Sequence, residues 1–80
     1  MRYRTGQKIR VGDTVIADGM RGVVVCDFDS REFAEGYEAY DVPPTMEMLG
    51  GGFLSSGVMI KTIEAGLIHY TGEFGEIESV

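Results

Sequence analysis

The chain contains one cysteine and one histidine, Cys26 and His69, which are its only candidates for nucleophilic catalysis. A nucleophile needs a base and an orienting group within hydrogen-bond reach. Cys26 ends the apolar run that starts at Val23, which predicts a buried small hydrophobic residue. His69 lies between two apolar residues in a different predicted hairpin. We therefore predict no catalytic residue. We expect a protein that binds another macromolecule and has no catalytic activity.

Metal and phosphate sites are also not indicated. A single histidine and a single cysteine nearly exclude the usual nitrogen and sulfur ligands of zinc. The segment from Asp27 resembles the start of a calcium loop, but Arg31 stands at a ligand position and Glu32 replaces the required glycine. Gly50–Gly52 lacks the lysine that follows in a phosphate-binding loop, so we interpret it as a hinge. We predict no metal and no cofactor.

Residues suited to binding are concentrated in one stretch, where aromatic and acidic side chains alternate. Aromatic rings anchor protein interfaces, and acids attract basic partners and raise the association rate. Residues 29–56 carry six acids against one arginine, a net charge of −5. An alternative for each ring is that it covers the open end of a barrel. We expect six residues to contact a partner: Phe33, Glu35, Tyr37, Glu38, Tyr40 and Asp41.

The charge of the whole chain is −6, and it is unevenly distributed. Residues 1–10 form a basic arm of +4, whereas residues 11–80 hold all thirteen acids and only three cations, a net charge of −10. A body this acidic repels the phosphates of nucleic acids and attracts a basic partner. The predicted partner is therefore a basic protein, and nucleic acid and membrane are not expected partners.

Length and composition indicate one globular domain, residues 1–80. The hydrophobic fraction of 44% and the charged fraction of 25% are ordinary for a folded protein. A single cysteine cannot form an internal disulfide, and a lack of disulfides is typical of proteins in a reducing compartment. We see no signal peptide and no apolar run of about 20 residues, so the expected location is the cytoplasm.

Two hairpins are predicted from short apolar runs separated by glycine. Asp18-Gly19 follows the strand Thr14–Ala17 and is a strong hairpin signal, although the connection could extend four residues before the strand Val23–Phe28. The second hairpin joins residues 58–63 to residues 67–70 through Glu64-Ala65-Gly66. Residues 75–80 could add a last strand. The buried positions that we expect are Val15, Val23, Val25, Ile60 and Leu67.

The run from Val11 to Val25 resembles the opening of small SH3-like barrels of the KOW type. In that family a Gly-Asp turn and a strand, here Gly12-Asp13 and Val15, lead through a glycine-bearing hairpin into a second strand, here from Gly22. The resemblance implies a small barrel and a role in binding RNA or ribosomes. The family hairpin is usually longer and richer in lysine than this one. Size and acidity also resemble small acidic bacterial immunity proteins, which block a toxin by binding it.

We therefore expect an all-β fold, an SH3-like partly open barrel of about five strands with one long insertion after strand two, residues 29–56. The predicted function is a non-enzymatic binding module that acts on a basic protein, as an immunity-type inhibitor does. One alternative is a KOW-like module that binds RNA or a ribonucleoprotein. Another is a structural subunit of a larger assembly.

The charge distribution predicts no strong binding to generic RNA or duplex DNA at physiological salt, because phosphates are repelled by the acidic body. A gel-shift titration measures this. A low-micromolar shift with a steep salt dependence would contradict the prediction and favour the KOW-like alternative. In that case, deletion of residues 1–10 is expected to abolish the shift, because this arm holds the only clustered positive charge.

Overall fold

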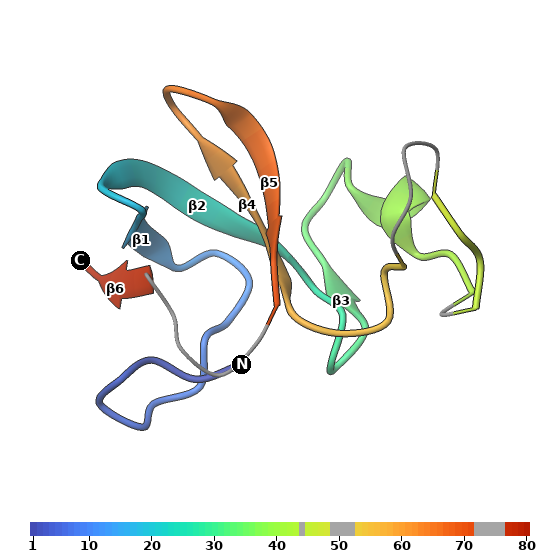
Figure 1. The fold of residues 1–80 in the computed structure, drawn as a ribbon, viewed down its shortest axis with the longest axis horizontal. Coiled ribbons are helices and arrows are strands. Elements are labelled where there is room, and N and C mark those ends of the chain that lie inside the picture. The colour runs from blue at the N-terminus through green and yellow to red at the C-terminus, as the bar shows by residue number, and fades with distance from the viewer. Residues whose placement is uncertain (44, 49–52, 72–76) are drawn as a thin grey trace.

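The computed structural model of the protein describes residues 1–43, 45–48, 53–71 and 77–80. Within them the fold is all-β, as expected, and one antiparallel sheet dominates it (Figure 1). A short 3-10 helix, η1 (Glu38–Tyr40), follows the third strand. The strands are β1 (Thr14–Ala17), β2 (Met20–Asp27), β3 (Glu32–Phe33), β4 (Val58–Thr62), β5 (Gly66–Tyr70) and β6 (Ile77–Ser79).

The sheet is open and has six strands rather than about five. Five of them lie in the order β5-β4-β2-β1-β6, so that the last strand pairs with the first, and β3 pairs with β2 away from this path. The connection from β2 to β4 contains only β3 and η1 as regular elements in its described part, which is where the sequence predicts the insertion. In Figure 1 this connection lies to one side of the sheet.

The two hairpins follow the turn chemistry of the sequence. Asp18 and Gly19 both have positive φ, 51° and 78°, as a two-residue hairpin turn of type I′ requires. Ala17 therefore pairs with Met20, and β2 starts three residues before the expected strand. In the second hairpin Gly66 takes a φ of 71°, a left-handed conformation that glycine adopts at no steric cost.

A β-bulge at Val25 shifts the pairing between β2 and β4. Val24 lies opposite Ile60, but Cys26 lies opposite Met59, so Val25 has no partner on β4. Because side chains alternate along a strand, one extra residue moves every later side chain to the other face. We call the face that bears Val24 and Ile60 the inner face and the face that bears Cys26 and Met59 the outer face.

The inner face carries the larger of two buried clusters, which we call the first core. Its members come from four strands and from the basic arm: Tyr3, Ile9, Val15, Ala17, Val24, Val58, Ile60 and Ile77. Tyr3 and Ile9 are buried, and the Tyr3 hydroxyl donates a hydrogen bond of 2.7 Å to Asp13. The expected basic arm is therefore part of the folded domain, and removing residues 1–10 would remove part of its core.

For two of the five residues that we expected in the core, the prediction of burial is wrong. Val15, Val25 and Ile60 are buried, but Val23 and Leu67 are 40% and 39% exposed. Val23 pairs with Lys61, and Lys61 pairs with Leu67, so all three lie in one row on the outer face. Apolar character alone does not say which face of a sheet is covered, and this part of the outer face is not.

Some sequence-based predictions concern residues outside the described part. The hinge Gly50–Gly52 and the first two residues of the predicted last strand, Gly75 and Glu76, belong to this group. The last strand itself is present as β6, which pairs with β1. Among the described residues, no helix has the length and apolar content needed to cross a membrane.

The two faces of β4 make a matched test of the core. Ile60 is fully buried, and Ile63, just after the strand, is 78% exposed. Ile60→Ala is expected to cost about 2–5 kcal/mol of the free energy of unfolding, because it leaves a cavity. Ile63→Ala should change it by less than about 0.5 kcal/mol. Urea denaturation measures both, and equal losses would contradict the assignment of the faces.

Candidate protein-binding surface

The insertion, residues 29–56, is attached to the sheet by a second core on the outer face. This cluster contains Val25, Cys26, Phe28, Leu54 and Met59, all buried. It exists because the bulge turns Cys26 and Phe28 outwards. Six residues of the insertion pack against it while partly buried: Phe33, Ala34, Tyr37, Tyr40, Val42 and Met48.

The three aromatic rings predicted to bind a partner all belong to this packing. Phe33 meets the buried ring of Phe28 edge-on, at 5.8 Å between ring centroids and 67° between planes. Tyr37 and Tyr40 stack on each other at 6.3 Å and 23°. Each ring is half-buried, so its inner side packs against the second core. The rings therefore hold the insertion in place and also present an edge at the surface.

Arg31 joins three parts of the insertion. Its guanidinium donates hydrogen bonds to the carbonyl oxygens of Leu54 at 3.1 Å and Val42 at 2.8 Å. It also forms an ion pair with Asp41 and lies 5.4 Å from the centre of the Phe33 ring. The planar guanidinium can serve several acceptors at once, which a lysine cannot. Arg31 therefore connects β3, the segment after η1 and the segment that leads into β4.

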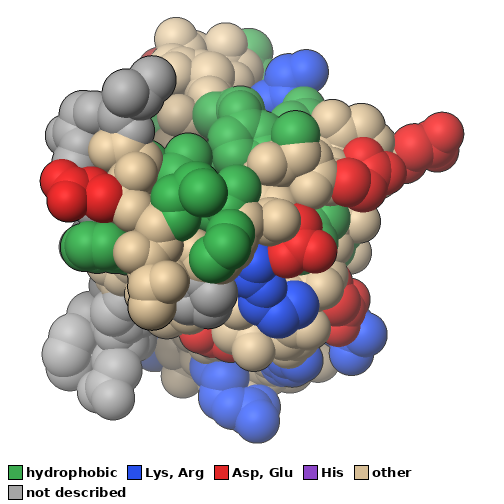
Figure 2. Space-filling view, turned by 90° about the vertical axis from the view of Figure 1, so that its right-hand side faces the viewer, with side chains coloured by type: hydrophobic (Ala, Val, Ile, Leu, Met, Phe, Trp, Pro, Cys, Tyr) green, Lys and Arg blue, Asp and Glu red, His purple; other side chains and the backbone are tan. Residues whose placement is uncertain are grey.

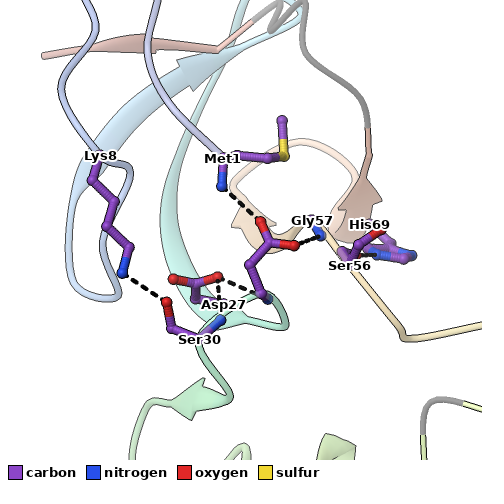
Figure 3. A network of polar contacts seen from close by, with 8 residues as sticks. Met1, Lys8, Asp27, Ser30, Ser56, Gly57 and His69 are labelled. Atoms are coloured by element: carbon purple, nitrogen blue, oxygen red, sulfur yellow. Dashed lines mark hydrogen bonds and ion pairs between the residues drawn. The ribbon is translucent and has the colours of Figure 1, made fainter.

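Polar contacts hold the start of the insertion (Figure 3). Asp27 is buried, and its carboxylate accepts hydrogen bonds from the backbone N–H groups of Asp29 at 3.1 Å and Ser30 at 3.3 Å. The Lys8 ammonium donates a hydrogen bond of 2.6 Å to the Ser30 hydroxyl. The turn after β2 is thus built around the Asp27 side chain and connected to the basic arm.

Asp29 connects the same turn to the entrance of β4. Its carboxylate accepts hydrogen bonds from the N–H of Gly57 at 3.1 Å and from the Met1 amino group at 2.7 Å. The hydrogen bond from the Met1 amino group holds the pKa of Asp29 below its usual value. Partial desolvation raises this pKa, whereas the Gly57 N–H and the charge of Lys8 lower it further. Both ends of the insertion are therefore tied together.

The acids that we predicted to face a partner have different surroundings. Asp41 is bound by Arg31, so its charge is largely neutralised within the chain. Glu38 accepts a hydrogen bond of 2.9 Å from the N–H of Gly36 and remains exposed. Glu35 is exposed, as is Glu47 further along the insertion. Glu35, Glu38 and Glu47 are the acids that can offer charge to another molecule.

Two exposed apolar side chains of the insertion were not singled out from the sequence. Met46 and Phe53 are each 48% exposed, and Glu47 pairs with Phe53 in an isolated antiparallel bridge, which brings these residues together. Figure 2 shows hydrophobic side chains gathered on the insertion side of the molecule, with acidic side chains on both sides of them. No sequence signal marked either side chain as exposed, because exposure depends on the surrounding surface and not on the residue type.

Cys26 and His69 do not form a reactive pair in this arrangement. Met59 of β4 pairs with both, so their backbones are separated by one strand and lie roughly 10 Å apart. Burial raises the pKa of the Cys26 thiol to about 11, so it is protonated at neutral pH. The Nε2 atom of His69 lies 2.8 Å from the carbonyl oxygen of Ser56, and its ring packs edge-on against Phe28 at 5.2 Å.

No protein-family model, no curated protein and no solved structure matches this chain.

The contacts of Arg31 predict how the insertion responds when they are lost. In Arg31→Lys, an ammonium cannot replace the bonds to Leu54, Val42 and Asp41 together. We expect a loss of about 1.4 kcal/mol or more in local stability, which is about tenfold in amide hydrogen exchange of residues 34–42. Hydrogen–deuterium exchange measures this, and the exchange of β4 should change much less.

Arg10→Lys is the matched control. Within the described residues the Arg10 side chain forms only a long surface ion pair, 3.9 Å from Glu32, and such pairs contribute little. If the two variants exchange alike, Arg31 does not hold the insertion.

Proposed function

We propose that the protein is a non-enzymatic binding module whose insertion docks on a basic protein. One observation carries this proposal: Met46 and Phe53 stand half-exposed on a segment that also presents Glu35, Glu38 and Glu47. Exposed apolar side chains surrounded by polar ones mark interaction sites. We call these five residues the insertion patch.

The support beneath the insertion patch favours tight binding. The second core, Arg31 and the contacts of Asp27 and Asp29 hold the segment before any partner arrives. A surface that is already ordered loses less entropy on association. Met46 and Phe53 would supply buried apolar area, and the acids would steer a basic partner to the patch.

An immunity-type inhibitor is the concrete form of this proposal, with a basic toxin or enzyme as its target. The supports are the small size, the net charge of −6 and the acidity of the segment that carries the patch. An acidic inhibitor gains a fast association rate with a basic enzyme, and it needs no catalytic group of its own. Inhibition follows if the patch covers the active site of the target.

We also propose that the sheet is an SH3-like, partly open barrel. The order β5-β4-β2-β1-β6 supports this, because four strands follow one another in a meander and the last returns beside the first. The fold hosts many functions, so it does not choose between a protein partner and RNA. The charge of the insertion patch is our reason for preferring a basic protein.

Binding kinetics with the native partner test the patch. The wild-type protein captures its partner from the source cell, and the purified partner is then titrated with variants. Phe53→Ser and Met46→Ser should each weaken binding by about 2 kcal/mol, or about 30-fold, if they are anchors. Val80→Ser is the matched control, because Val80 is 64% exposed outside the patch. Tyr37→Phe and Tyr40→Phe test the ring edges without disturbing their packing.

The acids have a different expected effect. The pair Glu35→Gln and Glu38→Gln should slow association and flatten its salt dependence, with little change in dissociation. Glu64→Gln, in the turn between β4 and β5, is the control. If every folded variant binds as the wild type does, or if the captured partner is RNA, the proposal is wrong.

A further inference from the structure

The outer face of the sheet is covered by the insertion at one end only. Beyond the second core lie two cross-strand rows whose described side chains are exposed. In the first row Thr14 pairs with Val23, Val23 with Lys61, and Lys61 with Leu67. In the second row, two residues away, Arg21 lies beside Ile63, whose N–H donates to the Arg21 carbonyl oxygen at 3.0 Å.

Three of the large hydrophobic side chains that are exposed belong to these rows. Val23 is 40%, Leu67 39% and Ile63 78% exposed. A shallow hollow of about 250 Å³ lies at Val23 and Ile63, and Thr14, Arg21 and Lys61 also line it. Leu67 lies beside Lys61 in the first row but does not line the hollow. This volume is below the range of about 300–1,000 Å³ typical of pockets that enclose small molecules. It suits one or two side chains of another protein.

The charged residues that line this hollow are both cations, whereas residues 11–80 as a whole carry a net charge of −10. Only three cations follow residue 10, and one of them, Arg31, is bound within the insertion. The other two, Arg21 and Lys61, both line the hollow, and neither forms an ion pair within the described residues. None of the residues that line the hollow is acidic in the described part of the chain.

We propose that this hollow, the outer-face site, docks an acidic and apolar segment of a protein partner. An apolar side chain would enter between Val23 and Ile63, and carboxylates on either side would pair with Arg21 and Lys61. Charged groups at the rim of an apolar contact set the orientation and the choice of partner. The site is distinct from the insertion patch in both position and sign of charge, so one chain could hold two different proteins.

Other occupants fit the site less well. Two cations on a chain of net charge −6 are too few to hold a nucleic acid, whose binding depends on many phosphate contacts. A second copy of the chain would bring its own charge of −6 close to the first, and the described residues that line the hollow include no acid to pair with the cations of the copy. An acidic segment of another protein meets the cations directly and brings less charge in total.

Two capped peptides test the proposal on the full-length protein. The first has a leucine–phenylalanine pair at its centre and two glutamates on each side, and the second has lysines in place of the glutamates. The amide NMR resonances of labelled protein should shift with the acidic peptide at Val23, Lys61, Ile63 and Leu67. The lysine peptide should bind at this site at least tenfold more weakly.

Variants separate this site from the insertion patch. Lys61→Glu and Arg21→Glu should each lower the affinity for the acidic peptide at least tenfold. Arg4 is an exposed cation elsewhere, so Arg4→Glu should leave this affinity within twofold of the wild-type value. Phe53→Ser removes an anchor of the insertion patch and should also leave the affinity for the acidic peptide unchanged. Thermal unfolding of each variant confirms that it is folded.

Three outcomes would overturn the proposal. The acidic peptide could cause no shifts, it could shift resonances only outside the two rows, or both peptides could bind equally. Sedimentation of the protein alone adds a fourth. A concentration-dependent dimer that Lys61→Glu abolishes would mean that the site serves a second copy of the chain. None of these outcomes bears on the basic partner of the insertion patch.

Discussion

At Val25 the strand β2 holds one residue more than β4, and this bulge decides which side chains meet on each face of the sheet. Before it, Val24 packs into the first core; after it, Cys26 and Phe28 pack on the opposite face. A regular strand would direct Phe28 to the inner face and leave the outer face without a second core. The insertion depends on that core for its attachment, and the fold therefore has two small cores that share the strands β2 and β4.

The same bulge separates two surfaces of opposite charge. The insertion covers the outer face near Met59 and carries the exposed side chains of Met46 and Phe53 together with exposed acids. The far end of that face stays bare and keeps Arg21 and Lys61 around an apolar hollow. In the described residues five of the six large hydrophobic side chains that are exposed belong to these two surfaces. These exposed apolar side chains, each set among charged ones, are the basis of the two docking proposals.

The composition of the sequence drew attention to the insertion. It did not show which side chains of the insertion pack inwards and which are exposed. Alternating rings and acids indicated the insertion as the binding segment, yet the rings pack inwards and Asp41 is paired with Arg31. Long-range pairing of this sort depends on which segments meet in space. Met46 and Phe53 carried no local signal, because exposure is a property of the whole surface and not of a residue type.

The sequence by itself determined the local structure of this protein. Asp18-Gly19 and Gly66 specify their turns through backbone conformations that few residues adopt, and the alternation in residues 58–63 specifies the two faces of β4. Only the tertiary structure decided which face is covered, and where. Val23 and Leu67 are as apolar as Val24, but they lie on the outer face, at the end that the insertion does not cover, and are therefore exposed. That outcome depends on contacts between distant segments, which local pattern does not encode.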